Sequence, residues 1–322
     1  MALKLLQITA PVSAESLLSK MARDHDAVSF EIAADLNDDH RLYFLLAKPT
    51  GRQELIDSLH NMLQTSSRAR VVICPVDATL PAPKTKSPSY TREELYQQLM
   101  LGSEVNWTYL ILGALSTFVA LVGLLQDNVA VVIGAMVIAP LLGPNLTFAL
   151  GTALNDQSMI KRAVKAALYG LFIAISISSL TGWLWGDIPA SDELLDRTVV
   201  GFDSVALAVA AGIAGVLSLT TGLSMTLVGV MVAVALAPPA ATFGFMLGAG
   251  DLKLAFGAGL LLSVNIVCVN LSALAVFLAK GFTARDVYTR RMGTKYIVIG
   301  LVGWTAALLV LMWVIGRGYN GL

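Results

Sequence analysis

The sequence predicts a polytopic α-helical membrane protein with an N-terminal α+β domain of ferredoxin-like topology. Hydrophobic residues make up 56% of the 322 residues and charged residues only 14%, with a mean hydropathy of +0.72. Soluble globular chains carry about 25% charged residues. The 22 basic and 22 acidic residues balance, so no net field attracts nucleic acid. The composition therefore excludes a purely soluble enzyme and a nucleic-acid-binding chain.

Residues 1–78 have the ordinary charge content of a soluble domain, and their pattern predicts the order strand, helix, strand, strand, helix, strand. This order is that of a split β-α-β motif used twice, the ferredoxin-like arrangement. Such a fold alone assigns no function, so both ligand sensing and assembly stay open. The six predicted elements are 3–9, 14–23, 28–33, 42–46, 55–63 and 71–74.

Residues 79–105 are predicted to form a Pro-rich linker and a helix next to the membrane. Pro81, Pro83 and Pro88 are typical of a semi-rigid connection. Thr91 and Glu94 have the spacing of a capping box, in which each side chain satisfies the backbone of the other. Because the chain starts without a long apolar leader, we expect the N-terminal domain to stay in the cytoplasm.

Residues 106–322 are predicted to form the transmembrane domain, since an apolar helix of about 20 residues crosses the hydrocarbon layer. Basic residues cluster after the second and sixth stretches, and acidic residues after the third. The positive-inside rule then places the N-terminus inside and the C-terminus outside. The seven predicted spans are 107–126, 128–152, 160–185, 204–221, 223–249, 254–279 and 296–316.

An internal repeat relates two parts of the transmembrane domain, about 106–186 and 201–281, with 296–316 as an extra span. An offset of 95 residues aligns 132–156 with 227–251 and matches eight positions, including Leu141 with Leu236 and Asp156 with Asp251. Three spans per copy would insert the second copy upside down. Inverted repeats of this kind are typical of secondary transporters.

Prolines interrupt the matched segments. Pro140 and Pro144 fall within the second span, and Pro238 and Pro239 fall within the fifth. Proline frees backbone carbonyls, which survive in a membrane only inside protein or beside a water-filled cavity. Broken helices at matching positions of two halves indicate a binding site. The alternative is that these prolines only kink packed helices.

The candidate site residues also include polar side chains outside the two predicted breaks. Asp127 and Asn128 suit either cation binding or a turn with a helix cap. Asn265 and Asn270 must either line a path or bond across helices. Asp156 and Asp251 are predicted to be helix caps. The predicted substrate- or ion-binding residues are Asp127, Asn128, Gly134, Pro140, Gly143, Pro144, Asn145, Thr147, Gly229, Pro238, Pro239, Thr242, Asn265 and Asn270.

The run from Gly123 to Pro144, GLLQDNVAVVIGAMVIAPLLGP, resembles the signature of the bacterial hydrophobic family called domain of unknown function 389. The stretches 77–81 and 91–96 resemble the branch that has an N-terminal soluble domain. This resemblance implies a prokaryotic inner-membrane protein of the topology above, and it implies no substrate.

We therefore expect a secondary transporter of a small polar or ionic solute, working by alternating access at the two breaks. A gated channel and a membrane sensor without transport are the alternatives. Motifs of known enzyme sites do not occur in a fitting context, so we expect no enzyme, no metal site and no cofactor. Sodium is the expected coupling cation, the bilayer and the solute are the expected partners, and a homo-oligomer is expected.

Overall fold

The computed structural model describes residues 3–37, 39–48, 52–63, 69–76, 91–221, 225–283 and 287–318. At residues 37, 63, 225–235, 287–296 and 317–318 it describes the backbone alone. The chain divides into two compact units, Met1–Glu94 and Leu95–Leu322. This boundary lies within one helix, α3 (Arg92–Gly102). The predicted linker at 79–88 lies outside the described residues.

The first unit contains a four-stranded antiparallel sheet in the order β2-β3-β1-β4. The chain order of strand, helix, strand, strand, helix, strand confirms the predicted ferredoxin-like succession. Its elements are β1 (Leu3–Pro11), the short 3₁₀ helix η1 (Val12–Ala14), α1 (Glu15–Asp24), β2 (Ser29–Asn37), β3 (His40–Ala47), α2 (Arg52–Leu63) and β4 (Arg70–Val76).

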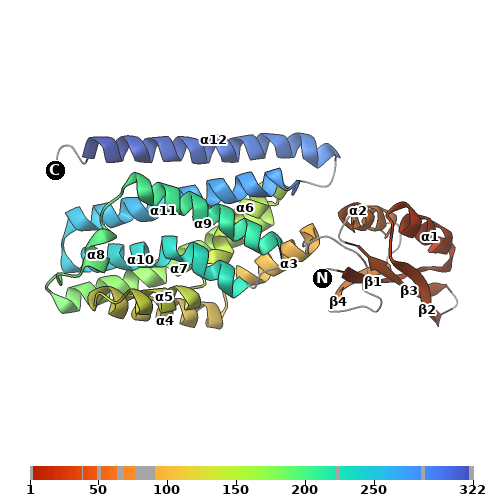
Figure 1. Cartoon of the computed structure of the whole chain (residues 1–322), viewed down its shortest axis with the longest axis horizontal. Coiled ribbons are helices and arrows are strands. Elements are labelled where there is room, and N and C mark those ends of the chain that lie inside the picture. The colour runs from red at the N-terminus through yellow and green to blue at the C-terminus, as the bar shows by residue number, and fades with distance from the viewer. Residues whose placement is uncertain are drawn as a thin grey trace. The chain divides into compact units, whose positions relative to one another are not determined.

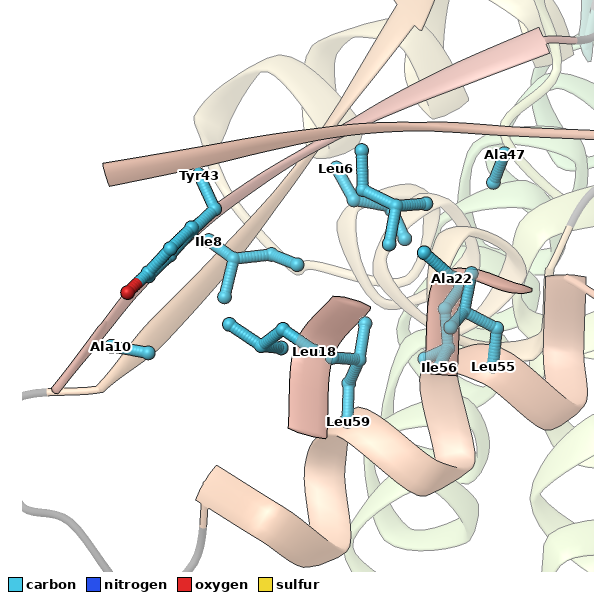
Figure 2. Close-up of a cluster of buried hydrophobic side chains, with 11 residues drawn as sticks. Leu6, Ile8, Ala10, Leu18, Ala22, Tyr43, Ala47, Leu55, Ile56 and Leu59 are labelled. Atoms are coloured by element: carbon cyan, nitrogen blue, oxygen red, sulfur yellow. The ribbon is translucent and has the colours of Figure 1, made fainter. Parts of the chain in front are cut away.

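The core of this unit lies between the sheet and its two helices. Figure 2 shows Leu6, Ile8 and Tyr43 of the sheet above Leu18 and Leu59 of the helices. Alternate residues of β1 are buried because successive side chains of a strand point to opposite faces. Burial of these side chains supplies the main stabilisation of the unit.

The predicted capping box forms at the start of α3. The Thr91 amide and hydroxyl both donate to a Glu94 carboxylate oxygen, at 2.9 and 3.0 Å, and the Glu94 amide donates back to the Thr91 hydroxyl at 3.3 Å. Lys4 pairs with the same carboxylate at 2.6 Å. Burial alone would raise the pKa of Glu94, but the bonds from Lys4 and Thr91 and the charges of Lys4 and Arg52 hold that pKa below its ordinary value.

The second unit is a bundle of helices, which Figure 1 shows running side by side with α12 along one edge. Its helices after α3 are α4 (Trp107–Leu125), α5 (Val129–Ile138), α6 (Leu142–Leu154), α7 (Gln157–Trp185), α8 (Asp192–Asp196), α9 (Phe202–Thr220), α10 (Met225–Ala249), α11 (Leu252–Ala279) and α12 (Val287–Gly318).

The apolar helices mark a membrane protein. Among the described residues, α4, α7, α9, α11 and residues 297–316 of α12 are long and apolar enough to cross a bilayer, and the bent pair α5–α6 would make a sixth span. The remaining predicted span, 223–249, corresponds to α10, in which side chains are described only from Leu236 to Ala249. The number seven and the N-in orientation stay predictions.

The predicted break at Pro140 is present. Helices α5 and α6 meet at an angle of 53°, separated by residues 139–141. Ala139 has φ −61° and ψ 122°, the extended conformation that a following proline favours. Pro144 lies in the first turn of α6, where its missing N–H has no helical partner to lose.

The predicted break at Pro238 and Pro239 is wrong, because both prolines lie inside the continuous helix α10. The φ angle of proline fits a helix, so the cost is lost hydrogen bonds and crowding with the preceding turn. Close packing of the second half of α10 on α7 opposes this cost. A Cβ on Gly248 would lie 1.9 Å from the Ser179 carbonyl, and one on Gly244 would lie 2.7 Å from the Ile175 carbonyl.

Several backbone features recur 95 residues along the chain. Helix α4 begins at 107 and ends at 125, and α9 begins at 202 and ends at 220. The residues that precede these helices, Asn106 and Gly201, have nearly the same dihedral angles, with φ −123° and −115° and ψ 174° in both. Each helix thus starts from the same backbone conformation.

The predicted caps Asp156 and Asp251 are confirmed, and they also recur at this offset. Asp156 accepts hydrogen bonds from the amides of residues 158 and 159, and Asp251 from those of 253 and 254. The residues before the two caps, Asn155 and Gly250, both have positive φ, at 58° and 84°. Two turns 95 residues apart therefore share their geometry in detail.

Candidate functional site

A cavity of about 170 Å³ lies beside the α5–α6 break, and it brings together predicted residues from distant parts of the sequence. Pro144 and Asn145 of α6 line it with Asn270 of α11. Leu141 and Leu236, which the 95-residue offset matches, both contribute to its wall. The remaining lining residues are Phe148, Ala163, Val164, Ala167, Leu168, Leu171, Ile266 and Trp304.

Asn145 and Asn270 form the polar part of this cavity. The Asn270 amide nitrogen donates to the Asn145 side-chain oxygen at 2.9 Å and to the Ile266 carbonyl at 2.8 Å. The Asn145 amide nitrogen donates to the Leu141 carbonyl, next to the break, at 2.9 Å. Asn270 was expected either to line a path or to bond across helices. It does both, because it lines the cavity and bonds to Asn145 of another helix.

The Asn270 side-chain oxygen is buried, and no partner for it occurs in the described part of the chain. Asn270 is only 2% exposed and Asn145 9%. A buried carbonyl oxygen without a donor is costly, so such a group in a native structure requires an explanation. Asn270 is also a lining residue of the cavity, so this oxygen without a described donor lies at the cavity wall.

Thr147 and Thr242 occupy matched positions but have different surroundings. The Thr147 hydroxyl donates to the Leu99 carbonyl at 2.9 Å and shares a 2.5 Å hydrogen bond with Ser103. It therefore fixes α6 to the end of α3 rather than back-bonding to its own helix. The Thr242 hydroxyl is fully buried and has no partner among the described residues.

A second cavity, of about 590 Å³, contains the other pair of predicted residues, Pro239 and Asn265. Asn265 is 6% exposed. Asp196, Arg197 and Asp203, with residues along α9, line the rest of this cavity. The predicted site residues thus lie in two cavities. Helices α10 and α11 contribute residues to both cavities, from neighbouring turns.

Asp127 and Asn128 take the capping alternative. Asp127, with φ 55°, accepts hydrogen bonds from the Glu193 amide at 2.8 Å and the Ser191 hydroxyl at 3.3 Å. Asn128 caps α5 by accepting from the Val131 amide at 3.2 Å. Neither residue lines the cavities described above.

Gly134 and Gly143 are not among the described residues that line these cavities. A Cβ on Gly134 would meet no atom within 4 Å, whereas one on Gly143 would lie 2.2 Å from the Gly102 carbonyl. Gly143 is therefore needed where α6 approaches α3. The surroundings of Gly229 lie outside the described side chains.

Sequence reasoning missed the apolar wall of the first cavity. Phe148 and Trp304 meet edge to face, with ring centroids 5.6 Å apart, and the wall from α7 comes from the first half of that helix. The signal that was present is Trp304, one of two tryptophans in the last apolar stretch. Its partner could not be inferred, because the two aromatic rings are far apart in sequence.

A family model described as "Domain of unknown function (DUF389)" matches residues 136–271. Over 264 residues the chain is 31% identical to "Uncharacterized protein MJ0678" of Methanocaldococcus jannaschii, which covers 80% of this chain and 82% of the relative. The chain belongs to the DUF389 family. The resemblance of the run before Pro144 is thereby confirmed. No solved structure matches this DUF389 protein.

The matched region of the DUF389 model begins in α5 and ends in α11. It therefore includes the α5–α6 break, the amide pair and α10. The first unit and α12 lie outside that match, so Trp304 lies outside it too.

Proposed function

We propose that this DUF389 protein transports a small solute across the membrane by alternating access. The observation that supports it best is the hydrogen bond between Asn145 and Asn270, because each residue comes from one half of the proposed repeat. This polar contact lies in a cavity beside a broken helix, where transporters place their binding sites. The fourteen candidate residues thereby reduce to Pro144, Asn145 and Asn270 in one cavity and Pro239 and Asn265 in the other.

The transport proposal includes an inverted repeat of three spans in each half. The shared cap and turn geometry at 156 and 251 supports it, as do the equal bounds of α4 and α9 after the offset. The halves differ at their centre, since the first is broken and the second carries Pro238 and Pro239 inside a continuous helix. An odd number of spans per half would give the two copies opposite orientations.

The positions of the two cavities support access from alternate sides. The acidic segment at Asp196 borders the second cavity, and the positive-inside rule assigns that segment to the outer face. The first cavity is lined by the part of α7 that follows the basic residues Lys161 and Arg162, which are assigned to the inner face. Leu236 of α10 lines the first cavity, and Pro239, one turn later, lines the second.

The proposed setting is a prokaryotic inner membrane, with the first unit in the cytoplasm and the C-terminus outside. A homo-oligomer and a coupling cation such as sodium remain part of the proposal. A channel would need both cavities to join in one state, whereas a sensor would need neither to exchange solute. Two distinct cavities, each lined by residues of α10 and α11, favour the transporter over the channel.

The experiment is solute uptake into proteoliposomes that contain the full-length protein. Labelled sodium and a panel of labelled amino acids, organic acids, amines and indoles would be tested with and without an imposed sodium gradient. We expect saturable uptake of one class, lowered at least tenfold by Asn145→Ala. The control is Ser263→Ala on α11, since the Ser263 hydroxyl donates only to Gly259 of its own helix, at 2.7 Å. Uptake that is absent for all probes would contradict transport.

A further inference from the structure

The chemistry of the first cavity restricts the solute that it can hold. The thirteen described residues that line it include no Asp, Glu, Lys, Arg or His. A charged molecule enclosed by such a wall would lose its hydration without gaining a counter-charge, which is unfavourable. An inorganic cation such as sodium also requires several oxygen ligands, and the described side chains of this lining supply two amide oxygens.

The polar group at the cavity wall that lacks a described partner is an acceptor. The Asn145 oxygen already accepts from Asn270, whereas the Asn270 oxygen has no donor among the described residues. A ligand that satisfies this oxygen must therefore present an N–H or O–H group. A ligand with acceptors alone would leave it unsatisfied.

The size of the cavity and its opening further define the ligand. A cavity of about 150 Å³ with an apolar wall holds benzene, and this one measures about 170 Å³. Val164 and Leu168 of its wall are 40% and 63% exposed, so other helices leave this part of the wall uncovered. We expect an apolar molecule to enter the cavity from the bilayer past these two residues.

We propose that this cavity binds an uncharged molecule with an apolar body about as large as an aromatic ring and one N–H or O–H donor, which bonds to the Asn270 side-chain oxygen. Phe148 and Trp304 pack against the body, and the donor reaches the amide pair. The inference rests on the proposed transport function for its biological meaning. It narrows the expected polar or ionic solute to an uncharged molecule that donates one hydrogen bond.

Indole and N-methylindole are matched probes for this site, because methylation removes the single donor and leaves the ring. Binding of tritiated indole to the full-length purified protein would be measured by scintillation proximity, with unlabelled N-methylindole as the competitor. We expect saturable indole binding and competition by N-methylindole that is about tenfold weaker, the effect of one lost hydrogen bond. Asn270→Leu should weaken indole binding by a similar factor.

A second variant covers the case in which Asn270→Leu fails to fold. Ala167→Phe fills the cavity from α7 and leaves the amide pair unchanged, so it should abolish indole binding in a folded protein. Ser263→Ala should bind as the wild type does. If unlabelled indole and N-methylindole compete equally well, the donor makes no bond to the protein and the proposal is overturned; a water molecule at the amide would give this result. Unchanged indole binding by the Ala167→Phe variant would also overturn it.

The indole-binding experiment and the solute-uptake experiment can fail independently of each other. Indole binding without uptake of any solute would leave this ligand class in place and contradict transport. Uptake of a charged solute without indole binding would support transport and overturn this ligand class.

Discussion

Asn270 donates a hydrogen bond to Asn145 across 2.9 Å, although 125 residues separate them. The bond joins α11 to α6 at the point where the chain resumes a helix after its break. Two buried amides thereby connect the parts of the chain that the 95-residue offset relates. The predictions below test whether this contact acts in transport or only in packing.

Substitution of Asn145 should affect function more than stability. In Asn145→Ala, a buried neutral hydrogen bond is lost, which costs about 1–3 kcal/mol with the unpaired partner included. Uptake of the transported solute should fall at least tenfold, because the amide pair forms part of the binding surface. Melting temperature and uptake would be measured on the same preparation. An equal fractional loss of folded protein and of uptake would favour the packing role.

The matched threonines should respond oppositely to the same substitution. Thr147→Val removes a hydroxyl with two partners, and we expect a loss of about 1–3 kcal/mol. Thr242→Val removes a buried hydroxyl without a described partner, so stability should stay equal or rise by up to about 1 kcal/mol. Thermal unfolding of the purified variants tests this pair. A larger loss for Thr242→Val than for Thr147→Val would contradict the structure.

The Glu94 ion pair should make the first unit sensitive to acid. The pKa of Glu94 lies below its ordinary value of 4.5 in the folded protein. A lowered pKa gives stability that is present above the unfolded value and is lost as the pH falls through the folded value. Protection of the β1 amides against hydrogen exchange, corrected for the intrinsic pH dependence of exchange, should therefore fall below about pH 4.5 in the full chain. Glu94→Gln should show lower protection at pH 7 and a smaller change in protection between pH 7 and 3.

Deletion of residues 1–80 should leave the second unit folded. This unit keeps its own core, and the end of α3 stays fixed by the bonds of Thr147 to Leu99 and Ser103. Units joined by a short connection fold separately when each has its own core. Size-exclusion profiles and melting of the truncated and full-length proteins test this. Aggregation of the truncated chain, with the full chain monodisperse, would show that the units depend on one another.

Local rules predicted the elements well because they rest on short-range chemistry. The capping box at Thr91 and the caps at Asp156 and Asp251 depend on residues within one turn, so the sequence alone sufficed. The same kind of rule was wrong at Pro238, where packing of α10 on α7 outweighs the proline penalty. Single-residue propensity cannot include that contact, since α7 lies far away in the sequence.

The candidate site was only partly predictable for the same reason. Asn145 was selected because it follows the predicted break, and Asn270 because it is an amide in an apolar stretch; the structure brings them together. Asp127 was selected as a carboxylate within an apolar signature, yet it accepts a hydrogen bond from Glu193 in α8, 66 positions away. The role of Trp304 depends entirely on how α12 packs, which no pattern near Trp304 indicates.

The most direct test of the account is whether the first cavity can be reached from both sides of the membrane. Ile266→Cys places a thiol in the cavity wall and keeps the amide pair, in a background of Cys74→Ser and Cys268→Ala. A membrane-impermeant maleimide would be applied to right-side-out and to inside-out vesicles, with the buried Ala273→Cys as the unlabelled control. Alternating access predicts labelling of Ile266→Cys from both sides. Labelling from one side only, or from neither side, would contradict it.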